Sequence, residues 1–198
     1  MIINVGKCHA FGIKKVQSMA KQVKPNLYLN NKLIDPIEIG KSFLYLGRYF
    51  DFDMSEQDHK EELKKVLADY MEKINNLPLH PKHKINIYQR YVLSKISWHL
   101  TISDIPLTWI KQNLDNIVSR YLRLWLTIPI SGTINVITLS RNKYGLSVLL
   151  TSTKATQCRT TFRLCLKHSS NPDIRGIHKD TSTTRISNTT ATSRLVMR

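Results

Sequence analysis

Residues 107–125 read LTWIKQNLDNIVSRYLRLW. Apolar side chains recur there three and four positions apart, at Leu107, Ile110, Leu114, Ile117, Val118, Tyr121, Leu122 and Trp125. This spacing places them on one stripe of an α-helix and predicts a helix that buries that face. We expect Asp104 to cap this helix, Pro106 to lie near its first turn, and Ile128-Pro129 to end it.

Similar patterns predict three more helices. Ser55-x-x-Asp58 is a capping-box-like start for a helix that runs to about Leu77. A second helix spans about Pro81 to Leu100, and a last one runs from Ser147 to about His168. Their apolar stripes indicate that these helices pack on one another as a bundle.

Residues 1–54 have the pattern of β-strands instead. Asn30-Asn31 lies between two apolar runs and predicts a two-residue hairpin turn, because Asn tolerates a positive φ. Residues 42–50, SFLYLGRYF, predict one aromatic strand in which Gly47 forms a bulge or a close approach.

The fold class expected from these patterns is α+β, a small antiparallel β unit followed by a mostly helical bundle. The predicted divisions are a β part over 1–54, a helical part over 55–168 and a tail over 169–198. Eleven of the thirty tail residues are Ser or Thr and five are Lys or Arg, a composition that predicts disorder.

The charge of the chain is strongly one-sided. Thirty Lys and Arg face fourteen Asp and Glu, and between residues 78 and 168 the ratio is thirteen to two, with aromatic residues interleaved. A field of this sign attracts polyanions, of which nucleic acid fits better than a membrane surface. Off the buried stripes, the candidate phosphate contacts are Lys95, Lys111, Arg120 and Arg123. A merely solvated basic face, or compositional drift, remains the alternative.

Three further groups are weighed as chemical sites. Asp51-x-Asp53 is the one close acidic pair of the β part, but it is interpreted as two solvated loop acids rather than a metal pair. His80-x-x-His83, and Cys158 with Cys165 and His168, lack the spacing of a zinc site. No metal site is therefore predicted.

Cysteine content and hydropathy indicate the compartment. Three scattered cysteines do not form a disulfide framework, so reduced thiols are expected. The chain has no apolar run of transmembrane length, and its first residues do not resemble a secretory signal. We expect an intracellular protein, nuclear or cytoplasmic, that is neither secreted nor membrane-bound.

Several motifs, in this order, resemble non-LTR retrotransposon reverse transcriptases, which are RNA-directed DNA polymerases. Asn4-x-x-Lys7-Cys8-His9-Ala10-Phe11 is similar to the strand that follows their catalytic loop. The primer-grip strand is matched by Phe43, Tyr45, Leu46 and Gly47. The thumb motif "R.WL.LP" is matched by Arg123, Trp125, Leu126 and Pro129. Tyr144-Gly145-Leu146-Ser147 resembles the next "GGLG" element, with its first and last glycines replaced. The resemblance covers residues 2–150.

This resemblance implies a separate role for each part of the chain. Residues 1–54 would be the end of the palm, with Lys7 as the palm lysine near the nucleotide phosphates and residues 43–47 as the primer grip. Residues 55–168 would be a thumb that holds the primer–template duplex, RNA–DNA or DNA. The family's metal-binding aspartates lie upstream of the lysine strand, and this sequence contains no Asp-Asp dipeptide.

The chain is accordingly expected to act as a fragment of such an enzyme, inactive by itself. It would hold no cofactor of its own, whereas the complete enzyme uses Mg²⁺. Its partners would be nucleic acid and the fingers and palm of the parent polymerase. Two alternatives stay open, a stand-alone basic nucleic-acid-binding protein and a decayed element copy without activity.

Overall fold

The computed structural model describes residues 8–17, 19–45, 47–53 and 55–176. Two predicted site residues, Lys7 and Leu46, lie outside the described residues, as do residues 177–198 of the predicted tail. Within the described part of that tail, residues 172–176 form one helical turn.

Residues 57–167 are mostly helical. The α-helices are α1 (Gln57–Asn75), α2 (Pro81–Ile87), α3 (Leu93–Ile102), α4 (Leu107–Ile110), α5 (Asn116–Leu126), α6 (Asn135–Thr138) and α7 (Thr151–Lys167). Two π-helical segments, η2 (Tyr88–Val92) and η3 (Lys111–Asp115), join α2 to α3 and α4 to α5 without a break, and η4 (Arg141–Lys143) is a 3₁₀ turn. None of the described helices is both long and apolar enough to cross a membrane.

The strands are short and form four separate pairs. They are β1 (His9–Ala10), β2 (Gly12–Val16), β3 (Met19–Val23), β4 (Tyr28–Leu29), β5 (Lys32–Leu33), β6 (Asp35–Pro36), β7 (Phe43–Tyr45) and β8 (Arg48–Phe50). Three pairs, β2–β3, β4–β5 and β7–β8, are antiparallel hairpins, and β1 pairs with β6 in parallel. The predicted α+β class is confirmed, although the strands do not join into a single sheet.

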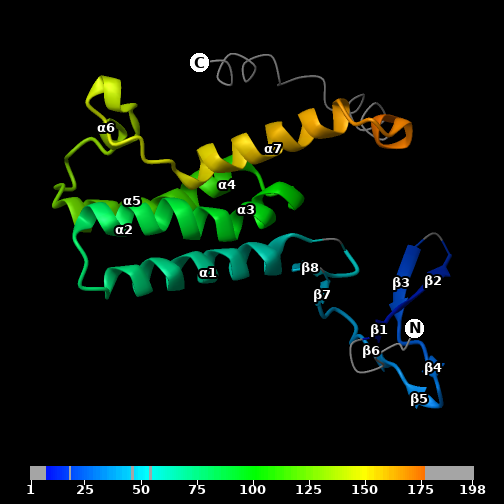
Figure 1. The fold of residues 1–198 in the computed structure, drawn as a ribbon. Coiled ribbons are helices and arrows are strands. Elements are labelled where there is room, and N and C mark those ends of the chain that lie inside the picture. Colours follow the sequence, from blue (N-terminus) through cyan, green and yellow to red (C-terminus); the bar gives the residue numbers. More distant parts are fainter. Residues whose placement is uncertain (1–7, 18, 46, 54, 177–198) are drawn as a thin grey trace.

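One hydrophobic core unites the helices. The predicted stripes supply it, with Leu67 and Met71 of α1, Tyr88 of η2 and Leu122 of α5 all fully buried. Figure 1 shows α1, α2 with α3, and α5 stacked along one another, with α7 laid over α3, while β1 to β6 lie beyond the end of the bundle. Burial of this apolar surface is the main term that stabilises the bundle.

The helix ends differ from the predicted caps. Ser55 lies two residues before α1, and its hydroxyl accepts a hydrogen bond from the Gln57 N–H (3.2 Å) rather than from Asp58 as a capping box requires. The residue that caps α4 is Pro106, not Asp104. α5 ends at Leu126, before Ile128-Pro129, because Thr127 takes a left-handed conformation with φ of 53°.

The two turn predictions had opposite outcomes. Asn30 and Asn31, with φ of 51° and 58°, form the predicted turn between β4 and β5. The prediction of one long strand over 42–50 with a bulge at Gly47 is wrong. Gly47, with φ of 79°, lies instead in the turn of the β7–β8 hairpin, and only glycine adopts that conformation without strain.

Candidate functional site

The β7–β8 hairpin, which carries the primer-grip-like residues, is held together by aromatic packing. Phe43 faces Phe50 in the register, with ring centroids 6.0 Å apart, and Phe11 packs on Phe43 at 5.7 Å. Tyr45 touches Phe50 by its edge (6.3 Å) yet keeps 59% of its surface exposed. Phe43 therefore shapes the hairpin, and Tyr45 presents an aromatic ring to solvent.

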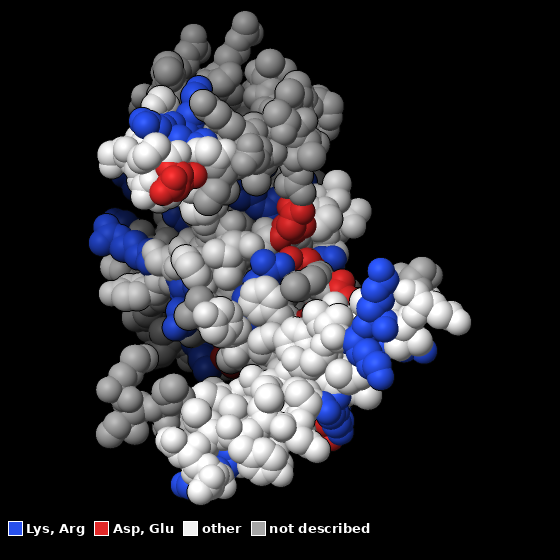
Figure 2. Space-filling model, turned by 90° about the vertical axis from the view of Figure 1, so that its right-hand side faces the viewer, with Lys and Arg blue, Asp and Glu red and all other residues white. Residues whose placement is uncertain are grey.

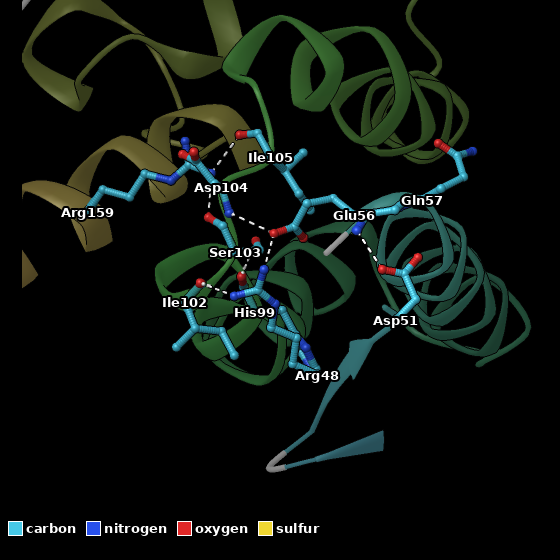
Figure 3. Close-up of polar contacts among 11 residues, drawn as sticks. Arg48, Asp51, Glu56, Gln57, His99, Ile102, Ser103, Asp104, Ile105 and Arg159 are labelled. Atoms are coloured by element: carbon cyan, nitrogen blue, oxygen red, sulfur yellow. Dashed lines mark hydrogen bonds and ion pairs between the residues drawn. The ribbon is translucent and has the colours of Figure 1, made fainter. Parts of the chain in front are cut away.

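Arg48 fastens this hairpin to the helices (Figure 3). Its Nη1 donates to the Ile102 carbonyl at the end of α3 (3.1 Å), and its Nη2 forms an ion pair with Glu56 just before α1. The same Glu56 carboxylate accepts a hydrogen bond from the Asp104 N–H (3.4 Å). A half-buried, hydrogen-bonded ion pair of this kind fixes orientation well, because each partner also satisfies backbone groups.

The turn of the hairpin lies against α3. A β-carbon placed on Gly47 would lie 3.8 Å from Nε1 of Trp98, an ordinary van der Waals distance. Trp98 keeps 53% of its surface exposed despite this neighbour. The hairpin turn and the Trp98 indole therefore lie side by side.

That surface continues along η2 and α3. Tyr91, Lys95 and Trp98 follow one another at spacings of four and three residues, and all three are exposed, Tyr91 by 72%, whereas Tyr88, Val92 and Ile96 of the same helix are buried. We call these three residues the exposed stripe. Tyr91 and Lys95 also line a groove of about 350 Å³ whose other wall is Tyr70 and Lys73 of α1 with Leu77, which follows that helix.

The other predicted phosphate contacts lie elsewhere. Lys111 is exposed beside a groove of about 1000 Å³ between η3 and α7, where Lys154 also lies. Arg120 and Arg123 line a third groove, between α1 and α5. The structure thus brings Lys95 close to the primer-grip-like hairpin and distributes Lys111, Arg120 and Arg123 over two other grooves.

Both arginines, Arg120 and Arg123, form contacts within the fold. Arg123 Nη1 donates to the carbonyls of Pro129 (2.6 Å) and Gly132 (2.9 Å) and so closes the loop after α5. The Arg120 guanidinium lies over the Tyr121 ring (4.9 Å) and donates to its hydroxyl (3.3 Å). That hydroxyl donates in turn to Glu72 (2.5 Å), and burial together with this carboxylate raises the pKa of Tyr121.

Charge is not gathered in one patch on the face that Figure 2 shows. Figure 2 views the molecule from the side on which the strands lie and shows Lys and Arg in several separate groups, with acidic side chains between some of them. α1 has more acidic than basic side chains and forms a wall of two grooves, one with Lys95 and one in which Glu72 accompanies Arg120.

The described residues contain no cluster of three or more His, Cys, Asp or Glu side chains with the arrangement of a metal site. Asp51 accepts a hydrogen bond from the Ser55 N–H (2.6 Å), which orders the approach to α1. His80 caps α2 by accepting from the Lys82 N–H (3.2 Å). These two side chains therefore have local structural roles.

Tyr91 and Trp98 belong to the candidate site but were not among the contacts predicted from the sequence. Their positions relative to Lys95, four before and three after, were a usable signal, since the buried stripe of the same helix uses the other positions. The position of Gly47 against Trp98 had no such signal, because it depends on how the hairpin docks.

Comparison with known proteins gives no assignment: no protein-family model matches the chain, and no curated protein matches its sequence. The function proposed below is therefore supported by the hairpin, the exposed stripe and the charge of the chain.

Proposed function

We propose that the chain binds the sugar–phosphate backbone of a nucleic-acid duplex, RNA–DNA or DNA, through the β7–β8 hairpin and the exposed stripe. The observation that carries this proposal is the meeting of the Gly47 turn with Trp98, at one end of a row of exposed aromatic and basic side chains. Large exposed aromatic residues beside lysine are a composition suited to nucleic acid.

The chemistry of such a contact follows from the side chains. The Lys95 ammonium is a point charge suited to a phosphate oxygen, and the flat faces of Tyr91, Trp98 and Tyr45 suit sugars or bases exposed at a strand end. None of these groups reads a base-pair edge in a defined way. Binding should therefore depend on salt and differ little between sequences.

In the family that the sequence resembles, these elements would be the primer grip and thumb of a reverse transcriptase. The upstream fingers and palm would be the partner of this chain, and they would supply the carboxylates that hold Mg²⁺. The chain itself would orient the duplex and catalyse nothing, in an intracellular setting where its nucleic acid is made.

The binding test is a titration of labelled RNA–DNA and DNA duplexes at several salt concentrations. About six phosphate contacts would give a log–log slope of about −5. Tyr91→Ala/Lys95→Gln should weaken binding about tenfold and flatten the slope by about one. Tyr144→Ala/Lys143→Gln, an exposed Tyr–Lys pair far from the hairpin, is the matched control and should bind like the wild type. A salt-independent or absent interaction would favour compositional drift.

A primer-extension assay with Mg²⁺ or Mn²⁺ tests the proposed lack of catalysis. We expect no template-dependent incorporation by the purified chain. Incorporation that persists in Asp51→Ala and Asp53→Ala would contradict the fragment hypothesis, and incorporation lost in those variants would restore the acidic pair as a metal site.

A stand-alone nucleic-acid-binding protein is the second candidate. It is favoured by the helical core, to which the described helices from α1 to α7 all contribute buried residues. The coding DNA upstream separates the two: an in-frame or frameshifted palm with an Asp-Asp turn supports the polymerase origin or a decayed copy of the element, and its absence supports the stand-alone protein.

A further inference from the structure

A second basic surface lies in the amino-terminal hairpins. Residues 8–34 contain five lysines and no Asp or Glu. All five are exposed, and they lie on or next to the hairpins β2–β3 and β4–β5: Lys14, Lys15, Lys21, Lys24 and Lys32. None of the residues considered above as phosphate contacts belongs to this group.

The register of β2–β3 concentrates this charge. Lys14 lies directly opposite Lys21, so both ammonium groups project from the same face of the hairpin. Like charges at directly opposed strand positions destabilise a hairpin. The ion pairs among the described residues, Arg48–Glu56 and Lys73–Asp69, are remote from this hairpin and do not neutralise it.

Apolar side chains lie beside the lysine pair on its own face. Val16 pairs with Met19 on the same face toward the turn, and Met19 is 60% exposed. Tyr28 of the neighbouring hairpin is 69% exposed. A face of exposed lysines and apolar groups, with an exposed tyrosine on the neighbouring hairpin, complements a polyanion whose sugars and bases are also accessible.

The hairpin is held in place although it extends beyond the helices (Figure 1). Gln22, on its other face, donates through Nε2 to the Glu38 carbonyl (3.3 Å) and accepts from the Gly40 N–H (3.1 Å) through Oε1. These two bonds tie β3 to the loop before β7, the first strand of the primer-grip-like hairpin. The lysine face therefore has a defined position relative to that hairpin.

We propose that β2–β3 and β4–β5 form a second phosphate-binding surface, which contacts the nucleic-acid backbone in addition to the exposed stripe. The Lys14–Lys21 pair lies at its centre, and a phosphate group between the two ammonium groups relieves their repulsion. This inference rests on the proposed duplex binding and extends it, because two separate contact surfaces on one nucleic acid reinforce each other.

The test compares the full chain with Lys14→Gln/Lys21→Gln. Loss of two phosphate contacts should flatten the log–log salt slope by about 2 and weaken duplex binding at least tenfold at low salt. The urea midpoint of unfolding should stay equal or rise, because the variant removes the cross-strand repulsion. Lys60→Gln/Lys65→Gln, which removes the same charge from the acidic helix α1, is the matched control and should keep the wild-type slope.

The other outcomes separate a failure of this inference from a failure of the proposed function. If Tyr91→Ala/Lys95→Gln weakens binding and Lys14→Gln/Lys21→Gln does not, the hairpin inference fails and the proposed function stands. If only the hairpin variant weakens binding, the stripe is not the contact. If the wild type does not bind duplex but binds phosphatidylserine vesicles through Lys14 and Lys21, both nucleic-acid proposals are overturned.

Discussion

The imidazole rings of His59 and His99 lie with their centroids 5.3 Å apart, and they join the first turns of α1 to the last turns of α3. His59 is only 2% exposed, and His99 is half-buried. Within the described chain, His59 Nε2 and His99 Nδ1 are buried without a hydrogen-bond partner, as are Arg48 Nε and Glu56 Oε2 nearby. At this junction, where the β7–β8 hairpin meets the bundle, these polar atoms have therefore lost contact with water without gaining a hydrogen bond, which costs stability.

The His pair predicts that stability falls in mild acid. Burial lowers the pKa of His59, the nearby His99 and Arg48 lower it further, and Glu56 opposes them. Burial and Lys95 lower the pKa of His99, against Glu62. Below the ordinary value of 6.5 the unfolded chain binds protons that the folded chain does not, so stability should be full above that pH and fall as the pH decreases through the folded pKa values.

Urea unfolding at a series of pH values between about 7.5 and 5 measures this loss. His99→Phe removes one titrating ring and keeps a planar side chain, so its midpoint should fall less steeply with decreasing pH. A wild-type midpoint that is constant over this range would contradict the predicted role of the pair.

Asp115 should prove structural rather than functional. Its carboxylate is 7% exposed and accepts bonds from the Ser152 N–H (3.0 Å) and hydroxyl (2.5 Å), at the first turn of α7. Asp115→Ala removes both bonds and a favourable charge at a helix N-terminus, so it should cost about 2 kcal/mol in urea unfolding. Asp53→Ala, which removes an exposed acid, is the control and should cost less than about 0.5 kcal/mol.

Arg159 and Arg163 offer a matched pair on α7. Arg159 donates to the carbonyls of Leu100 (3.1 Å), Ser103 (3.2 Å) and Ile105 (2.7 Å), and so fastens α7 to the end of α3. Arg163, one turn later, is exposed.

Arg159→Ala leaves three carbonyls with lost bonds and should destabilise the protein by about 2–3 kcal/mol in thermal or urea unfolding. Arg163→Ala should change stability by less than about 0.5 kcal/mol. Equal effects of the two substitutions would show that Arg159 does not hold the helices together.

The helices could be predicted because their apolar residues follow the helical period closely. Ile110, Leu114 and Val118 were assigned to a buried stripe from spacing alone, and all three are fully buried. Helix ends were harder, since Asp115, which lies far from α7 in sequence, caps that helix. A local pattern contains no information about such a partner.

Charge was the least predictable property from sequence. Arg123 and Arg159 count as basic residues in the composition, yet both donate hydrogen bonds to backbone carbonyls within the fold. Conversely, the lysine pair of β2–β3 depends on strand register, which sets Lys14 opposite Lys21. Net charge thus indicated a polyanion, but the contact surfaces depended on tertiary structure.

Gly47 gives the most direct test of the primer-grip-like turn, because Gly40 has nearly the same φ but lies outside that hairpin. The two residues have φ of 79° and 77°, so alanine at either position should cost about 1 kcal/mol of stability. A β-carbon at Gly40 would have no atom within 4 Å, whereas one at Gly47 would lie beside Trp98. Both substitutions place alanine at a positive φ, and only the one at Gly47 adds an atom beside Trp98.

We expect Gly47→Ala to weaken duplex binding several-fold, because strain in the turn alters the surface that the turn forms with Trp98. We expect Gly40→Ala, which keeps the N–H that bonds Gln22, to weaken binding less. Urea midpoints test whether the two variants are equally stable. Duplex titration at one salt concentration compares their affinities. Equal affinity of both variants would separate the turn from binding and leave Lys95 and its neighbours on α3 as the contact.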